Sequence, residues 1–231
     1  MTSEMELQAL KNFLEQQFDL DHMDLPDEYN YTCLPLCLLD AVYSIGVKYA
    51  STQNSVKRYC QRYGIPCYKH DNNGSECKHT ISDLIQNIEM VGTEHFASDI
   101  LMNQQRTSSQ NGILKAQAVL ECAKVFQEAG IECIEDFRNK LNTSIEKKYL
   151  AVKGQASGIS FRYLCMLCGD ENHIKPDRHI VQFLQDHCTK SATADNAEDI
   201  LQTVLTKLSS DHCDLTLRKL DYVIWEYQSR K

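Results

Sequence analysis

A glycine-rich stretch followed by a single aspartate contains the residues whose types and spacing could do chemistry. The stretch spans residues 150–161, and its Gly154 and Gly158 can adopt positive φ and let the backbone approach another group closely. The amides that open the next helix have no partner inside it, so they favour an anion such as phosphate. Asp177 follows in the segment 174–180, at the start of a further helix. We therefore expect contact with a nucleic-acid backbone, and chemistry by Asp177.

The elements that position these residues are predicted to be helices. Apolar residues recur three and four positions apart in almost every segment, and no segment shows the alternation of apolar and polar residues that is typical of a strand. The segment 33–43 is apolar nearly all round, which is typical of a helix in the centre of a bundle. Residues 64–79 combine Gly, Pro and Asn-Asn-Gly, which indicates a surface loop. The other predicted helices span 7–18, 53–63, 80–91, 94–103, 113–129, 133–142, 157–168, 177–187, 195–209 and 214–229, the last capped by Asp214 or Thr216. We expect an all-α, two-lobed helical bundle that forms a single globular unit over 1–231.

The turn and the aspartate together resemble the helix-hairpin-helix DNA glycosylase superfamily, as a divergent relative of its endonuclease III-like members. Residues 152–160, Val-Lys-Gly-Gln-Ala-Ser-Gly-Ile-Ser, match the hairpin of that family, and residues 176–179, Pro-Asp-Arg-His, match its aspartate motif at a similar spacing. Weaker similarity to the buried helix of the family and to its later Lys-Ala helix lies at 38–46 and 112–118. The resemblance covers residues 35–190.

The resemblance implies a division of the chain and an activity on damaged duplex DNA. The implied parts are a helical-barrel lobe over 35–143, the helix-hairpin-helix and aspartate loop over 144–180, and a second lobe from 1–34 with 181–231. Cleavage of an N-glycosidic bond builds an oxocarbenium-like sugar, and a carboxylate beside it can stabilise the charge and orient water. Asp177 is the implied catalytic residue.

The resemblance also implies which residues touch DNA. The implied hairpin contacts are Lys153, Gly154, Gln155, Ala156, Ser157 and Gly158. The target base must leave the stack and enter a pocket. Candidate residues for that pocket are Tyr43, Ser44, Gly46, Lys48, Tyr49 and His179, although core packing is an alternative for the tyrosines.

Departures from the family pattern narrow the expected chemistry. Ala156 replaces the second hairpin glycine, and Gly158 stands where bifunctional members have their Schiff-base lysine. The four-cysteine iron-sulfur motif near the C-terminus is absent, since only Cys188 and Cys213 lie there. We therefore expect a monofunctional DNA N-glycosylase without a cofactor or an iron-sulfur cluster.

Two other functions are compatible with the same residues. The net charge of -8 excludes coating of nucleic acid by bulk charge and favours a non-catalytic DNA-binding protein on the same fold. In a helical interaction or scaffold protein, Asp177 would be a helix N-cap, and the two glycines would end a helix or allow a close crossing.

The cysteines indicate a reducing compartment. Eleven cysteines are scattered among helical patterns, which is typical of reduced thiols in an intracellular protein of the cytoplasm or nucleoid. No apolar run is long enough for a membrane span, and the acidic N-terminus is unlike a signal peptide. Soft metal ligands gather at Cys60, Cys67, Cys77 and His79, but their spacing matches no compact zinc site, so no metal is predicted.

Overall fold

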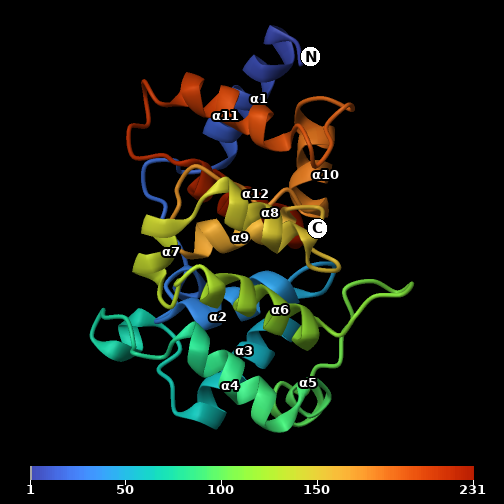
Figure 1. The fold of residues 1–231 in the computed structure, drawn as a ribbon. Coiled ribbons are helices and arrows are strands. Elements are labelled where there is room, and N and C mark those ends of the chain that lie inside the picture. The colour runs from blue at the N-terminus through green and yellow to red at the C-terminus, as the bar shows by residue number, and fades with distance from the viewer. Residues whose placement is uncertain (1) are drawn as a thin grey trace. The chain divides into compact units, whose positions relative to one another are not determined.

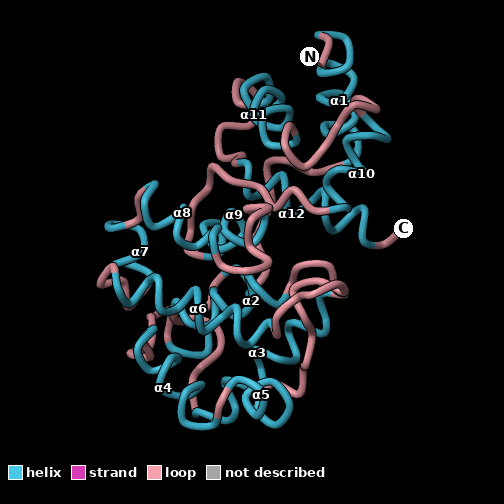
Figure 2. Tube along the Cα trace, turned by 45° about the vertical axis from the view of Figure 1, so that its right-hand side comes forward, coloured by secondary structure: helices cyan, strands magenta, loops and turns pink. Residues whose placement is uncertain are grey.

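The computed structural model describes residues 2–231, apart from the side chain of Glu28. Within this part of the chain every regular element is helical, and β pairing is limited to two isolated bridges, Tyr31 with Tyr68 and Arg106 with Leu114 (Figures 1 and 2). The all-α fold class is therefore confirmed. Among the described helices, none combines the length and the apolar character that a membrane span requires.

The chain divides into two compact units. One comprises Met1–Pro26 with Gly169–Lys231, and the other comprises Asp27–Cys168. Each unit has its own hydrophobic core. The unit boundaries differ from the predicted lobe boundaries, because the segment 35–143 and the glycine turn belong to one unit. The lobe division implied by the family resemblance stays a prediction. Met1, which belongs to the predicted second lobe, lies outside the described residues.

The unit Asp27–Cys168 contains most of the helices. They are η1 Asp27–Tyr29, α2 Leu34–Tyr43, α3 Tyr49–Tyr63, η2 Lys69–Asn72, α4 Ile81–Val91, α5 Thr93–His95, the π-helix η3 Phe96–Ile100, α6 Lys115–Glu128, α7 Ile134–Lys140, α8 Thr143–Ala151 and α9 Ile159–Leu167. All residues of α2 are buried, and α6 and α9 pack against it (Figure 1). The central position predicted for the segment 33–43 is confirmed.

The other unit joins the N-terminal helix to the C-terminal helices. Its elements are α1 Glu4–Gln17, α10 Arg178–His187, α11 Ala197–Leu208 and α12 Leu217–Ser229. Here α1 packs on α11, and α10 packs on α12. Thr216 is the N-cap of α12, because its side chain accepts a hydrogen bond of 3.2 Å from the Lys219 amide. One of the two caps predicted for this helix is thus confirmed.

The helix predicted for 94–103 is present over 93–100, and most of it is a π-helix. The segment contains the short α5 followed by the π-helix η3, in which the Leu101 amide donates to the Phe96 carbonyl at 3.0 Å. That bond spans one residue more than an α-helical bond. Phe96, Ala97 and Leu101 are buried. Their spacing suits either helix, so apolar periodicity did not separate the two forms.

The helix α8 was not among the individually predicted ones. Only Ile145 and Tyr149 of its residues are buried, so its apolar pattern is short. Its start is fixed by the Asn142 side chain, which accepts hydrogen bonds from the Ser144 amide at 2.9 Å and the Ile145 amide at 3.2 Å. This N-cap is the sequence signal that would have revealed the helix.

Candidate functional site

The glycine turn 152–158 connects α8 to α9. Gly154 has a φ of +93°, and Gly158, the N-cap of α9, has a φ of +71°. Two successive backbone hydrogen bonds shape the turn, from the Gln155 amide to the Val152 carbonyl at 2.9 Å and from the Gly158 amide to the Gln155 carbonyl at 3.0 Å. Positive φ is the property for which glycine is suited. The positive φ predicted at both glycines is confirmed.

Gln155 holds the turn from inside the unit. Its side chain is 3% exposed, and its Oε1 accepts a hydrogen bond from Ser160 Oγ. Ser160 Oγ in turn accepts a hydrogen bond of 3.2 Å from the Tyr149 hydroxyl. This buried chain of polar groups fixes the turn between the two helices that it connects. The Gln155 side chain therefore faces the core, although it was predicted among the DNA contacts.

The other side of the turn faces solvent. Lys153, Gly154, Ala156 and Ser157 are exposed, and Lys153 makes no ion pair with any residue that the structure describes. Within the same described part, the amides of Gly154, Ala156 and Ser157 donate no backbone hydrogen bond. Exposed amides at the start of a helix, beside a lysine, can hold an anion. This face of the turn is a candidate phosphate contact.

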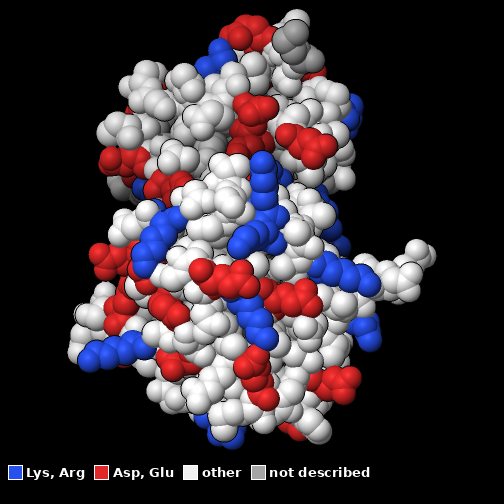
Figure 3. Space-filling model, in the orientation of Figure 1, with Lys and Arg blue, Asp and Glu red and all other residues white. Residues whose placement is uncertain are grey.

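A protruding loop lies directly against the turn. The loop spans 106–114 and is closed by the Arg106–Leu114 bridge, and Figures 1 and 3 show it extending outward before α6. A Cβ atom placed on Gly154 would lie 2.3 Å from Thr107 Cβ. Only glycine allows this approach without displacement of Thr107. The close backbone approach expected of the hairpin glycines thus involves another loop of the same unit.

Of the tyrosines predicted to line a base pocket, Tyr43 lies in the core and Tyr49 is half-buried. The Tyr49 hydroxyl donates to Asp40 Oδ2 at 3.0 Å, and the hydroxyls of Tyr31 and Tyr163 donate to the same oxygen at 3.0 and 3.3 Å. Asp40 is fully buried. Three phenol donors stabilise a carboxyl that burial alone would strongly disfavour as an anion. The network is structural, which agrees with the core-packing alternative for Tyr49.

The segment after α2 combines buried and exposed candidates. Tyr43 and Ser44 are buried, whereas Gly46 and Lys48 are exposed. Lys115 Nζ donates to the backbone carbonyls of Tyr43 and Ile45, at 2.8 Å each, so it closes the C-terminal end of α2. Tyr43 and Ser44 therefore do not form the wall of an open pocket. Gly46 and Lys48 remain available for contact with a ligand.

Asp177 is the N-cap of α10. Its Oδ1 accepts hydrogen bonds from the His179 amide at 2.8 Å and the Ile180 amide at 3.3 Å. The side chain is half-buried. Its second oxygen, Oδ2, accepts no hydrogen bond from the residues that the structure describes. The carboxylate thus has a structural role through one oxygen, and its second oxygen takes no part in the cap.

Acidic residues hold the segment that leads to Asp177. Asp221 Oδ1 accepts a hydrogen bond of 2.8 Å from the Lys175 amide, and Glu198 Oε2 accepts one of 3.1 Å from the Ile174 amide. Asp221 is buried on α12, and this burial, together with the charge of Asp177, raises its pKa well above the ordinary value. Burial and the nearby Asp177 thus both favour the neutral form of the Asp221 carboxyl.

His179 lies on the same face of the unit as Trp225. The two rings are in an edge-to-face arrangement with centroids 6.4 Å apart. His179 is half-buried, and its Nε2 accepts a hydrogen bond of 3.4 Å from Arg178 Nε. His179 therefore belongs to the surroundings of Asp177, whereas the other pocket candidates belong to the unit Asp27–Cys168.

The cysteine-rich segment contains no metal cluster. Among the described residues, no three His, Cys, Asp or Glu side chains are placed to hold a metal ion. His79 Nε2 is 2.7 Å from the Tyr59 hydroxyl, and the neighbouring Cys67 thiol, together with burial, raises the pKa of Cys60. The four soft ligands noted in the sequence thus have other partners.

The surface carries charges of both signs. Figure 3 shows acidic side chains between the basic ones on the visible face. Lys148 lies 3.3 Å from Glu128, and Lys124 lies 2.6 Å from Glu89. Neutralised lysines attract a polyanion less, so a nucleic-acid contact needs a local site such as the turn.

The fold and the glycine turn define an all-α protein with a candidate anion site between two helices. The family model described as Domain of unknown function (DUF8548) matches residues 8–229. The chain belongs to this family. Comparison with curated proteins and with solved structures found none with significant similarity to it.

Proposed function

We propose that this protein is a helix-hairpin-helix DNA glycosylase-like repair protein that acts on damaged duplex DNA. The observation that carries the proposal is the turn 152–158. It combines left-handed Gly154 and Gly158 with exposed amides and an unpaired Lys153, all between two helices. Backbone amides and one cation suit a phosphate of the DNA backbone, which positions a protein without reading the base sequence.

The proposed reaction is hydrolysis of the bond between a damaged base and its sugar. The water oxygen bonds to C1′ of the sugar while the bond from C1′ to the base nitrogen breaks. Asp177 stabilises the positive charge on the sugar and accepts the proton of the water, which passes to the released base. The half-buried Asp177, with Oδ2 outside the cap, supports this role. No amine stands at Gly158, so no Schiff base forms there and the DNA strand stays intact.

The proposal requires that a damaged nucleotide comes within reach of Asp177. The target nucleotide must also leave the helix stack. Gly46 and Lys48 are the exposed residues among those predicted for the pocket, and they are the candidates for contact with the displaced nucleotide.

DNA binding through the turn is tested by a matched pair of charge reversals. Lys153→Glu places a negative charge on the turn, whereas Lys124→Glu makes the same charge change on α6, where Glu89 is the partner. Affinity for a duplex with a stable abasic-site analogue is measured between about 50 and 200 mM salt. We expect Lys153→Glu to weaken binding about tenfold or more and to reduce the salt slope by about 1, with little effect of Lys124→Glu.

The possible results of this binding experiment distinguish the three candidate functions. Equal losses in the two variants would remove the turn from the DNA interface. Undetectable binding of the wild type at low salt would leave the interaction or scaffold function. Binding that depends on Lys153 without release of any base would favour the non-catalytic DNA-binding protein on the same fold.

A further inference from the structure

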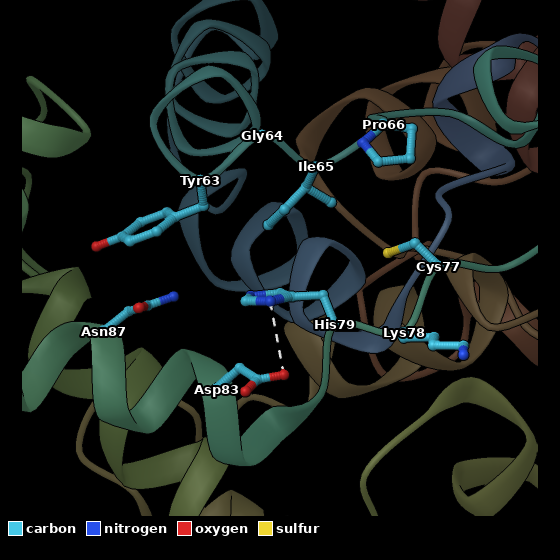
Figure 4. Close-up of a pocket in the computed structure, with 9 residues that line it drawn as sticks. All are labelled: Tyr63, Gly64, Ile65, Pro66, Cys77, Lys78, His79, Asp83 and Asn87. Carbon is cyan, nitrogen blue, oxygen red and sulfur yellow. Dashed lines mark ion pairs between the residues drawn. The ribbon is translucent and has the colours of Figure 1, made fainter.

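A pocket of about 420 Å³ opens beside the end of α3 in the unit Asp27–Cys168. Its lining includes Tyr63, Cys77, His79, Asp83 and Asn87 (Figure 4). Figure 4 shows the Cys77 sulfur pointing toward the other lining residues, while Lys78 points away from them. None of the residues proposed to act on DNA lines this pocket. A thiol that is accessible from solvent through a pocket can meet a small reagent.

A second thiol lies behind Cys77. The Cys77 amide donates to the Thr32 carbonyl at 2.9 Å, and Thr32 directly precedes Cys33, the N-cap of α2. The Cys33 thiol is buried and lies beside the sulfur of Cys77. Cys77 itself is half-buried. One cysteine of the pair therefore faces the pocket, and the other is enclosed.

The surroundings activate only the outer cysteine. The neighbouring Cys33 thiol, the Thr32 side chain and the nearby backbone amides of His79 and Cys77 lower the pKa of Cys77 to about 6, against the opposing effect of burial. Burial and the proximity of Cys77 raise the pKa of Cys33. At pH 7 Cys77 is therefore mostly a thiolate and Cys33 a thiol. The thiolate is the nucleophilic form of cysteine.

We propose that Cys77 and Cys33 form a peroxide-reactive pair, with Cys77 as the attacking thiolate and Cys33 as the resolving thiol. The Cys77 sulfur bonds to one oxygen of hydrogen peroxide, the O–O bond breaks, and the departing hydroxide becomes water by taking a proton from solvent. Cys77 is then a sulfenic acid. The Cys33 sulfur attacks the Cys77 sulfur, the S–O bond breaks, and the hydroxide leaves as water with the Cys33 proton. Two thiols are oxidised to one disulfide, and one peroxide is reduced to two waters.

The disulfide would join the start of α2 to the loop that precedes α4. In a reducing compartment such a bond is transient, which suits a redox sensor rather than a structural staple. The pair does not depend on the proposed action on DNA.

The test exposes the reduced full-length protein to one equivalent of hydrogen peroxide at pH 7, followed by alkylation, trypsin and mass spectrometry without reductant. Trypsin releases Cys77 alone in the peptide 70–78, whereas Cys33 shares the peptide 12–48 with Cys37. Fragmentation of the linked peptides assigns the bond. We expect a Cys33–Cys77 disulfide. With Cys33→Ser, we expect a sulfenic acid at Cys77 that a dimedone probe captures.

Two internal references keep the test decisive. Cys213 is exposed and gives the reactivity of a cysteine outside a pocket, and Cys67→Ser removes the outer thiol of the neighbouring Cys60–Cys67 pair. We expect alkylation of Cys77 at pH 6.5 to exceed that of Cys213 at least tenfold, and peroxide oxidation of Cys77 to persist in Cys67→Ser. The proposal fails if Cys77 reacts no faster than Cys213, or if peroxide links only Cys60 with Cys67. Both measurements on the wild type remain valid if a variant does not fold.

Discussion

Replacement of Gly154 by alanine tests the geometry of the turn. A Cβ at this position would lie 2.3 Å from Thr107 Cβ, far inside the usual contact distance of about 3.5–4.0 Å between carbons. The displacement of Thr107 costs about 1–3 kcal/mol, as other overpacking does. The φ of +93° adds about 1–3 kcal/mol for a residue with a side chain. We expect Gly154→Ala to lower the free energy of unfolding by about 2–6 kcal/mol.

Gly158→Ala is the matched control, because its φ of +71° carries conformational strain without a clash. The nearest atom to a Cβ on Gly158 is Leu150 Cδ2 at 3.8 Å, so only about 1–2 kcal/mol is expected. Urea denaturation followed by circular dichroism compares the two variants. In the double variant Gly154→Ala with Thr107→Gly, the clashing side chain is gone and part of the loss should return. Equal destabilisation by Gly154→Ala and Gly158→Ala would refute the close approach of the turn to the protruding loop.

Variants at three further residues test other parts of the structure. Asp177→Ala should lower the free energy of unfolding by about 0.5–2 kcal/mol in urea titrations, because the α10 cap is lost, whereas Asp177→Asn, an equally good cap, should change it by a few tenths. Asp221 has a raised pKa in the folded state, so its contribution to stability is full below its unfolded pKa and is lost as pH rises through the folded value. Asp221→Asn lacks this loss, so its stability relative to the wild type should increase between pH 4 and pH 7; an unchanged difference would contradict a buried, protonated Asp221. Lys115→Met leaves the carbonyls of Tyr43 and Ile45 without its hydrogen bonds and should cost about 2–5 kcal/mol, and a melting temperature equal to that of the wild type would argue against this C-terminal cap.

Local sequence patterns predicted much of the fold because they act over a few residues. The apolar character of α2 indicated its central burial, and Thr216 indicated the start of α12. The positive φ of Gly154 and Gly158 followed from the requirement of a tight turn. These features depend on neighbours in the chain, which the sequence shows directly.

The arrangement of the site depends on contacts that no local pattern contains. Tyr31, Tyr49 and Tyr163 are distant in sequence, yet their hydroxyls meet at Asp40, so single tyrosines near a motif suggested a pocket where the structure has a core. The contact of Asp221 with the Lys175 amide is likewise absent from any local pattern. Asp221 is a polar residue on the buried face of the amphipathic helix α12. A buried aspartate in an apolar stripe is a signal that could have identified it as a partner of the segment before Asp177.

The cysteine pair shows the same limit. Cys33 and Cys77 are separated by α2 and α3 in the chain, and in the sequence Cys77 stands out only as one of the soft metal ligands around the loop 64–79, whose spacing predicts no metal site. Backbone bonding of Thr32 to both Cys67 and Cys77 brings these segments together. Such pairing between loops carries no periodic signal.

Base release under single-turnover conditions tests the proposed function most directly. The wild type and Asp177→Asn are incubated in excess over duplexes that carry one alkylated, oxidised or deaminated base, and the released base and the strand are both measured. We predict release of one class of base with the strand intact, and a rate at least about 100-fold lower in Asp177→Asn, which keeps the helix cap but loses the carboxylate. Release of no lesion by the wild type, or full activity of Asp177→Asn, would contradict the proposal.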